Sequence, residues 1–357
     1  MLRPGTFALT LLLAMLTALG PLSMDMYLPS LPDIARDLQA PTARVSTLGC
    51  AASQSIDLLI GARFLQGIGG SGSIVLSRAI VRDLYSGVRA ARELSLMSSI
   101  AAFAPIVAPM IGGVFQTAFG WRANFFFMTA AAIVTLVVAA RLLPETVRRS
   151  SGEPISLYAL VRGFGVVLRH RGFVVYLGIL TLSYAGLFAW ISGASVVLQS
   201  VYGFSPVTFG STFAMGAAGY MAGALLAARL VAHLGLDRTM GLGVTLLAAG
   251  GLAMSAAVAT GIPGIWLIVA MTVYLAGLGL VLPQAMAGAL TPFPDRAGTA
   301  ASLMGLVQQT VAAAVAALIG GYLVRSAWPV TGIVVAMGCL TFLLWALTRG
   351  LRRQIAE

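Results

Sequence analysis

Charged side chains are scarce in this chain, and lysine is absent altogether. Only 9% of the 357 residues are charged, whereas 59% are hydrophobic and the mean hydropathy is +0.95. A soluble globule of this length needs far more polar surface to cover its core. The composition therefore excludes a soluble globular protein and indicates an all-α polytopic membrane protein.

Cysteine and histidine are almost as rare. Cys50 and Cys339 lie far apart in the chain, so they suggest packing residues and no disulfide framework. His170 and His233 have no Cys, His or carboxylate cluster around them, which argues against a metal site. No phosphate-binding P-loop is present, which argues against direct ATP drive. We therefore expect no enzymatic activity, no cofactor and no metal.

Long apolar segments, by contrast, recur along the whole chain. Each approaches the roughly 20 residues that a hydrocarbon core about 30 Å thick requires. They cover residues 6–28, 58–80, 95–115, 124–143, 173–198, 207–233, 240–258, 262–290, 300–324 and 330–347. The sequence predicts about ten transmembrane helices, an even number that puts both termini on one side.

The arginines predict which side that is. With the N-terminus in the cytoplasm, 17 of the 22 arginines fall in cytoplasmic segments. Arg36, Arg44, Arg122 and Arg325 fall outside, and Arg63 lies within the membrane. Because cytoplasmic loops carry the excess of positive charge, both termini are predicted to be cytoplasmic, as in an inner-membrane protein.

The longest cytoplasmic connection is predicted to divide two helical bundles. Residues 1–147 would form the first bundle, 148–172 the linker and 173–357 the second bundle. Within the linker, apolar residues from Leu157 to Leu168 recur at helical spacing opposite Arg162, which favours an amphipathic helix on the membrane surface. A disordered tether is the alternative.

Arg63 is the most informative residue, since a guanidinium in the membrane must face a wet cavity or a carboxylate. At about 1.5 Å per residue, Asp25 of the first helix and Arg63 of the second both lie roughly 9–12 Å inside the outer edge. A carboxylate in a partly desolvated site can take up and release a proton near neutrality, whereas a nearby arginine lowers its pKa again. The two residues are candidates for proton coupling, or for a static ion pair that joins two helices.

Aromatic and amide side chains supply a candidate substrate cavity for flat, lipophilic cations. Its candidate residues are Tyr27, Gln66, Tyr184, Phe188, Trp190, Tyr220, Tyr274, Gln308 and Gln309. Ordinary packing is the alternative for each aromatic residue. Pro283 predicts a bend that could act in alternating access, or a static kink.

Several stretches resemble the major facilitator superfamily, and specifically its Bcr/CflA-type drug-resistance exporters. They are residues 20–32, 63–69, 78–83, 104–113, 120–126 and 143–146. The resemblance implies that Arg63 takes part in proton coupling. It also implies that Pro105, Pro109, Gly112 and Gly113 form the antiporter stretch that shapes a helix closing the cavity. The proton gradient would then be the energy source.

The chain also departs from that family, whose members have twelve helices. Residues 37–45 resemble the entry to the family's second helix, and residues 51–57 already resemble the loop before its fourth. The family's second helix and most of its third helix are therefore expected to be missing. The motif between them, which closes the cytoplasmic gate in the family, is expected to be missing as well. A partial counterpart of the gate motif remains at residues 228–238. The expected fold is two bundles of four and six helices.

The expected function is a proton-coupled antiporter that exports small lipophilic or cationic drugs or metabolites. The alternative is an internally deleted relative that folds but no longer transports. The expected partners are a small-molecule substrate and the lipid bilayer, with no nucleic acid, and the expected state is a monomer.

Overall fold

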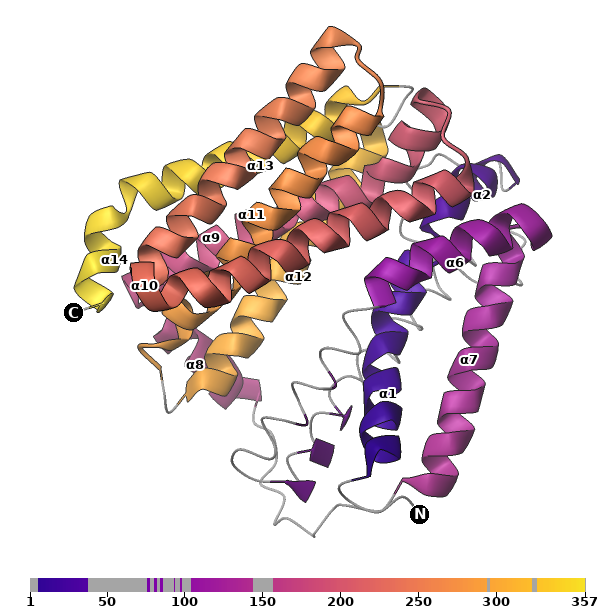
Figure 1. Ribbon diagram of the computed structural model, residues 1–357. Coiled ribbons are helices and arrows are strands. Elements are labelled where there is room, and N and C mark those ends of the chain that lie inside the picture. The colour runs from indigo at the N-terminus through magenta and orange to yellow at the C-terminus, as the bar shows by residue number, and fades with distance from the viewer. Residues whose placement is uncertain are drawn as a thin grey trace. The chain divides into compact units, whose positions relative to one another are not determined.

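The computed structural model describes residues 6–37, 76–77, 80–81, 84–85, 93, 97, 104–143, 157–293, 296–322 and 326–356. Every regular element within these ranges is a helix, as the sequence predicts (Figure 1). The chain divides into two compact units. Unit 1 comprises residues 1–152 with 204–214, and unit 2 comprises residues 153–203 with 215–357.

Unit 1 contains α1 (Phe7–Asp25), the 3-10 turn η1 (Leu28–Ser30), α2 (Leu31–Asp37), α6 (Ala104–Phe119) and α7 (Trp121–Leu142). α1 packs against both α6 and α7. Gly120 ends α6 because its φ of 80° lies in the left-handed region, which glycine adopts without strain. Leu9, Leu13 and Ala14 of α1 form an apolar core with residues further along the chain, which are Ile80, Val81, Tyr85 and Met97.

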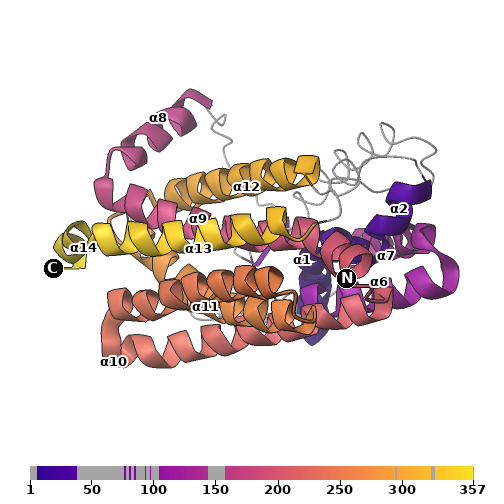
Figure 2. The same cartoon turned by 90° about the horizontal axis from the view of Figure 1, so that it is seen from above.

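Unit 2 begins with α8 (Leu157–Leu168), α9 (Arg171–Ser195) and the π-helical turn η2 (Val196–Val201). It continues with α10 (Pro206–Thr260), whose first turns up to residue 214 belong to unit 1. The remaining helices are α11 (Ile265–Leu290), α12 (Ala297–Tyr322), α13 (Trp328–Leu347) and α14 (Arg349–Ala356). α9 is the central helix, since it contacts α11, α12 and α13 and is buried on most of its surface. α8 and α14 lie at the end of the unit where α9 begins (Figure 2).

α10 is two membrane helices joined at a kink. Its 55 residues would extend far beyond a hydrocarbon core about 30 Å thick if they formed one straight helix. The helical geometry breaks at Gly235, whose φ is 76° and ψ is 172°. The two predicted segments at 207–233 and 240–258 are therefore confirmed as separate helices.

Six helices in the described ranges are long and apolar enough to cross a membrane, with α10 counted once. The apolar segments Phe7–Gly20 and Val107–Phe119 are shorter. α8 confirms that residues 157–168 form a helix and not a disordered tether. Helix boundaries differ by a few residues from the predicted ones; α7, for example, begins at Trp121 because Gly120 breaks the chain direction there.

Candidate functional site

Asp25 is the last residue of α1, and its neighbourhood is closed to solvent. The side chain is 9% exposed, and the following residues Met26 and Tyr27 are 0% and 4% exposed. The Tyr27 ring lies 5.9 Å from the Phe125 ring of α7, centroid to centroid. A carboxylate in such a position requires nearby polar or charged groups. Arg63 and Gln66 lie outside the described residues, so the pairing of Asp25 with Arg63 stays a prediction.

Gly112 of α6 packs directly on the backbone that follows Asp25. A Cβ atom built on Gly112 would overlap the carbonyl oxygen of Met26. Only glycine therefore allows α6 to approach the end of α1 this closely. Movement of α6 would displace the backbone next to the acid.

A second close contact of α6 is made with the first turns of α10, which belong to unit 1. A Cβ atom on Gly113 would lie 2.5 Å from the Pro206 carbonyl oxygen, and one on Gly210 would overlap the Pro109 carbonyl oxygen. Pro109 also has no N–H for the helical hydrogen bond to Pro105, which loosens α6 locally. The predicted antiporter stretch is thus a region of close helix packing.

Asn124 of α7 joins three elements of unit 1. It is fully buried, and its Nδ2 donates to the Ser30 hydroxyl oxygen at 2.9 Å and to the Gly112 carbonyl oxygen at 3.3 Å. Its Oδ1 atom is buried and accepts no hydrogen bond from the described residues. The amide therefore holds α6 in register with the turn that follows Asp25.

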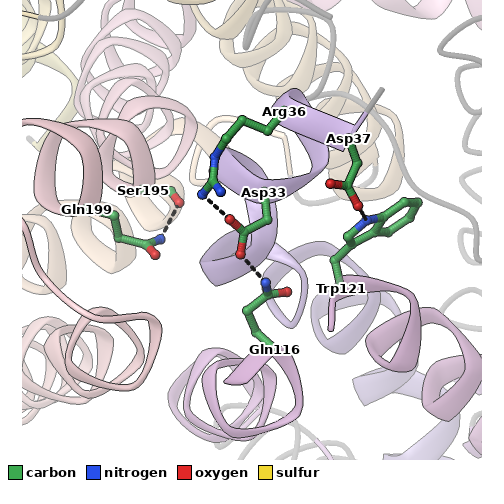
Figure 3. A network of polar contacts seen from close by, with 7 residues as sticks. All are labelled: Asp33, Arg36, Asp37, Gln116, Trp121, Ser195 and Gln199. Carbon is green, nitrogen blue, oxygen red and sulfur yellow. Dashed lines mark hydrogen bonds and ion pairs between the residues drawn. The ribbon is translucent and has the colours of Figure 1, made fainter. Parts of the chain in front are cut away.

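A polar network lies beyond this cluster, on α2 and the ends of α6 and α7 (Figure 3). The Gln116 amide donates to Asp33, which also pairs with Arg36. The Trp121 indole donates to Asp37 Oδ2 at 2.8 Å. These bonds fix the short helix α2 against α6 and α7, although α2 alone is too short to be stable in water.

Arg122 adds a positive charge at the same end of unit 1. Its guanidinium lies 4.1 Å from the centre of the Trp121 ring, and its Nη1 lies 3.9 Å from Asp37 Oδ2. Both contacts hold the charge close to the carboxylate. The network therefore contains both signs of charge, on side chains that are partly exposed.

The candidate cavity residues of unit 2 occupy different environments. Tyr184 and Phe188 are half-buried neighbours whose ring centroids lie 4.8 Å apart. Tyr274 is fully buried, and its hydroxyl donates to the Ser183 carbonyl oxygen at 3.1 Å. Trp190 is 5% exposed, whereas Tyr220 is 37% exposed. Of these aromatic residues, the ring contacts bring Tyr184 and Phe188 together.

The remaining predicted residues of unit 2 lie on α11 and α12. Gln308 is half-buried and Gln309 is exposed. α11 continues through Pro283 as one helix from Ile265 to Leu290. A Cβ atom on Gly279 would overlap the Tyr220 carbonyl oxygen, so α11 approaches α10 closely one turn before the proline.

Comparison with known sequences decides the family. The profile of the Major Facilitator Superfamily matches residues 42–317. The chain belongs to this superfamily of transporters.

It is 31% identical to an uncharacterized MFS-type transporter of Bacillus subtilis, YdgK, over 88% of each protein. It is 27% identical to a bicyclomycin resistance protein homolog of Haemophilus influenzae, over 92% of each. It is also 27% identical to multidrug resistance protein D of Escherichia coli, over 97% of this chain and 96% of that protein.

Solved transporter structures confirm the major facilitator fold. A POT family transporter bound to 5-aminolevulinic acid superimposes with a TM-score of 0.73 at 11% identity, covering 99% of each chain. A bacterial homolog of the lysosomal transporter Spinster gives 0.69 at 13% identity, covering 98% of this chain and 97% of the other. The chain is a multi-pass membrane protein of this superfamily, and drug-resistance proteins are among its relatives.

This major facilitator chain is shorter than its relatives within the aligned region. The alignments with the Bacillus and Escherichia proteins run over 359 and 387 positions, yet they take in 88% and 97% of the 357 residues. Roughly 40 positions of each relative therefore have no counterpart here, about the length of two membrane helices. The expected loss of two helices would account for a difference of this size, and the place of the missing positions in the chain stays a prediction.

Several polar residues of the unit 1 cluster were not predicted from the sequence. Asn124, Asp33 and Gln116 were not among the predicted site residues. Asn124 could have been found, because an amide inside an apolar segment requires a partner. Asp33 and Gln116 belong to segments far apart in the sequence, and no pattern predicts their contact.

Proposed function

We propose that this chain is a proton-coupled antiporter of the inner membrane that exports small lipophilic or cationic compounds. Asp25 is the group that binds and releases the proton, and Arg63 is the charge that biases it. Proton entry from outside drives substrate exit, with no cofactor and with the protein acting as a monomer. The proposal takes both termini to be cytoplasmic.

The buried position of Asp25 beside the glycine contact of α6 is the observation that carries this proposal. A buried carboxylate binds a proton more readily than an exposed one, because burial disfavours its charged form. The Gly112 contact links that acid to a helix that also packs against α10 through Gly113. A change in the charge of Asp25 can therefore bias the position of α6.

Proton-driven uptake of ethidium into everted membrane vesicles tests the proposal. We expect wild-type vesicles to accumulate the dye when a pH gradient is imposed, and to release it when an uncoupler is added. Asp25→Asn keeps the size of the side chain but cannot exchange a proton. Dye uptake should therefore fall to the level of vesicles that lack the protein. Asp37→Asn is the control, because its side chain is 53% exposed and an amide oxygen can still accept from Trp121. Full uptake by Asp25→Asn would contradict the role of Asp25.

A second candidate function is supported by the roughly 40 positions that the relatives have and this chain lacks, about two membrane helices. The chain would then fold and insert without transporting. Wild-type protein that is helical and monodisperse but moves no substrate in the vesicles would favour this alternative over the antiporter.

A further inference from the structure

A cavity of about 360 Å³ opens in unit 2 beside the kink of α10 and the start of α14. This volume is within the roughly 300–1,000 Å³ range of small-molecule sites. The residues that line it come from four helices and the Gly235 kink. They are Tyr176, Leu234, Gly235, Leu236, Asp237, Arg238, Gly288, Thr291, Arg349 and Arg352. The cavity lies at the end of the unit that carries the C-terminus, and it contains none of the predicted substrate residues.

The charges around the cavity are strongly unbalanced. Arg238, Arg349 and Arg352 contribute three positive charges, whereas Asp237 is the one acid among its described lining residues. Asp237 is already paired, because Arg352 Nε donates to its Oδ1 at 2.6 Å. Arg238 and Arg349 are exposed, so their side chains can reach a ligand that enters the cavity. The site therefore has an excess of positive charge.

Arg352 supplies a buried donor at this site. Its side chain is 1% exposed, and its Nη1 donates to the Trp345 carbonyl oxygen and the Thr348 hydroxyl. Its Nη2 is also buried and has no hydrogen-bond partner among the residues that the structure describes. Leaving a buried guanidinium donor without an acceptor costs more free energy than leaving a neutral donor without one, because the guanidinium is charged. The guanidinium fork matches the geometry of phosphate and carboxylate oxygens.

We propose that this cavity is a binding site for a phosphate group, held by Arg238, Arg349 and Arg352. A phosphate oxyanion complements the excess charge better than a single carboxylate does, and its several oxygens can accept from more than one guanidinium. The shared chemistry fits free phosphate compounds and phospholipid headgroups at the membrane surface. Because the ligand would join α14 to the α10 kink, it would stabilise the packing of unit 2 at this end.

Two binding measurements on the purified full-length chain test the site and distinguish the sources. In neutral detergent, inorganic phosphate is titrated while tryptophan fluorescence is followed, since Arg352 Cζ lies 5.3 Å from the Trp345 ring centre. In nanodiscs of phosphatidylcholine with or without phosphatidylglycerol, native mass spectrometry counts the lipids that remain bound. Saturable phosphate binding identifies a free phosphate compound as the ligand. Retention of phosphatidylglycerol without phosphate binding identifies the lipid headgroup.

The test variant is Arg238→Gln with Arg349→Gln, both at exposed positions. We expect the affinity for the bound probe to fall at least about tenfold, since a hydrogen bond to a charged group contributes enough for such a change. Arg229→Gln with Arg296→Gln removes the same charge from exposed arginines that do not line the cavity, so it should bind as the wild type does.

A second variant, Arg352→Lys, keeps the charge beside Asp237 but removes the Nη2 donor. It should also bind the probe more weakly, with unchanged helix content by circular dichroism. If the wild type binds neither phosphate nor phosphatidylglycerol, or if the Arg238/Arg349 variant binds as tightly as the wild type, the site does not exist. Neither result depends on transport, so the proposed antiport can fail while this site stands.

Discussion

Asn124 is predicted to stabilise unit 1 through its buried hydrogen bonds to Ser30 and Gly112. Asn124→Ala removes the donor to Ser30 and Gly112 and leaves a small void in a fully buried place. We expect the free energy of unfolding to fall by about 1–3 kcal/mol. The apparent melting temperature of the purified protein in detergent measures the change. Thr117→Ala is the control on α6, since Thr117 is exposed and its hydroxyl donates to the Gly113 carbonyl oxygen of its own helix. Equal melting of both variants would contradict the role of Asn124.

At the residue scale, the sequence shows which polar and aromatic residues are candidates for a site, but it does not predict how deeply each side chain is buried. Asp25 was selected because a carboxylate inside an apolar segment is unfavourable, and the structure buries it. Tyr274 and Tyr184 were selected by the same aromatic rule, yet the first is fully buried and hydrogen-bonded while the second is half-buried. Residue type could not distinguish them, because burial depends on which helix faces which neighbour.

At the scale of elements, the contact of α6 with the end of α1 and the start of α10 should be intolerant of any side chain. Gly112→Ala or Gly113→Ala would place a methyl group against backbone atoms of Met26 or Pro206, which cannot move aside as a flexible side chain can. We expect each variant to lose proton-driven ethidium uptake and to melt at a lower temperature.

Gly305→Ala is the matched control, since a Cβ atom there meets nothing within 4 Å. Alanine is the better helix former by about 1 kcal/mol, so this variant should be as stable as the wild type or more stable. Normal uptake by Gly112→Ala would show that α6 does not need the close approach.

The existence of the helices follows from apolar length, but their ends and pairings do not. The break between the two halves of α10 was predicted because one helix cannot be so long in a bilayer. The assignment of residues 204–214 to unit 1 was not predicted, because it depends on the mutual fit of Gly113 with Pro206 and Gly210 with Pro109. Such contacts join segments nearly a hundred residues apart, and no local pattern records them.

At the scale of the whole molecule, the direction of the chain through the membrane is predicted from arginine placement and can be tested directly. The two halves of α10 must cross in opposite directions, so the kink at Gly235 and the turn at Gly261 lie on opposite sides. With 17 of the 22 arginines on the inner side, the kink and the C-terminus are predicted to be cytoplasmic. The loss of two adjacent helices would leave this orientation unchanged, because an even number of crossings is removed.

Reporter fusions measure this orientation. Alkaline phosphatase fused after Gly261 should be active, because the enzyme folds only outside the cytoplasm, whereas fusions after Gly235 and Glu357 should be inactive. Green fluorescent protein fused at the same three positions should give the opposite pattern. If the fusion after Glu357 is active as a phosphatase, the C-terminus lies outside the cytoplasm. The cytoplasmic assignment of the C-terminus would then be wrong, and the phosphate cavity beside α14 would face the other side of the membrane.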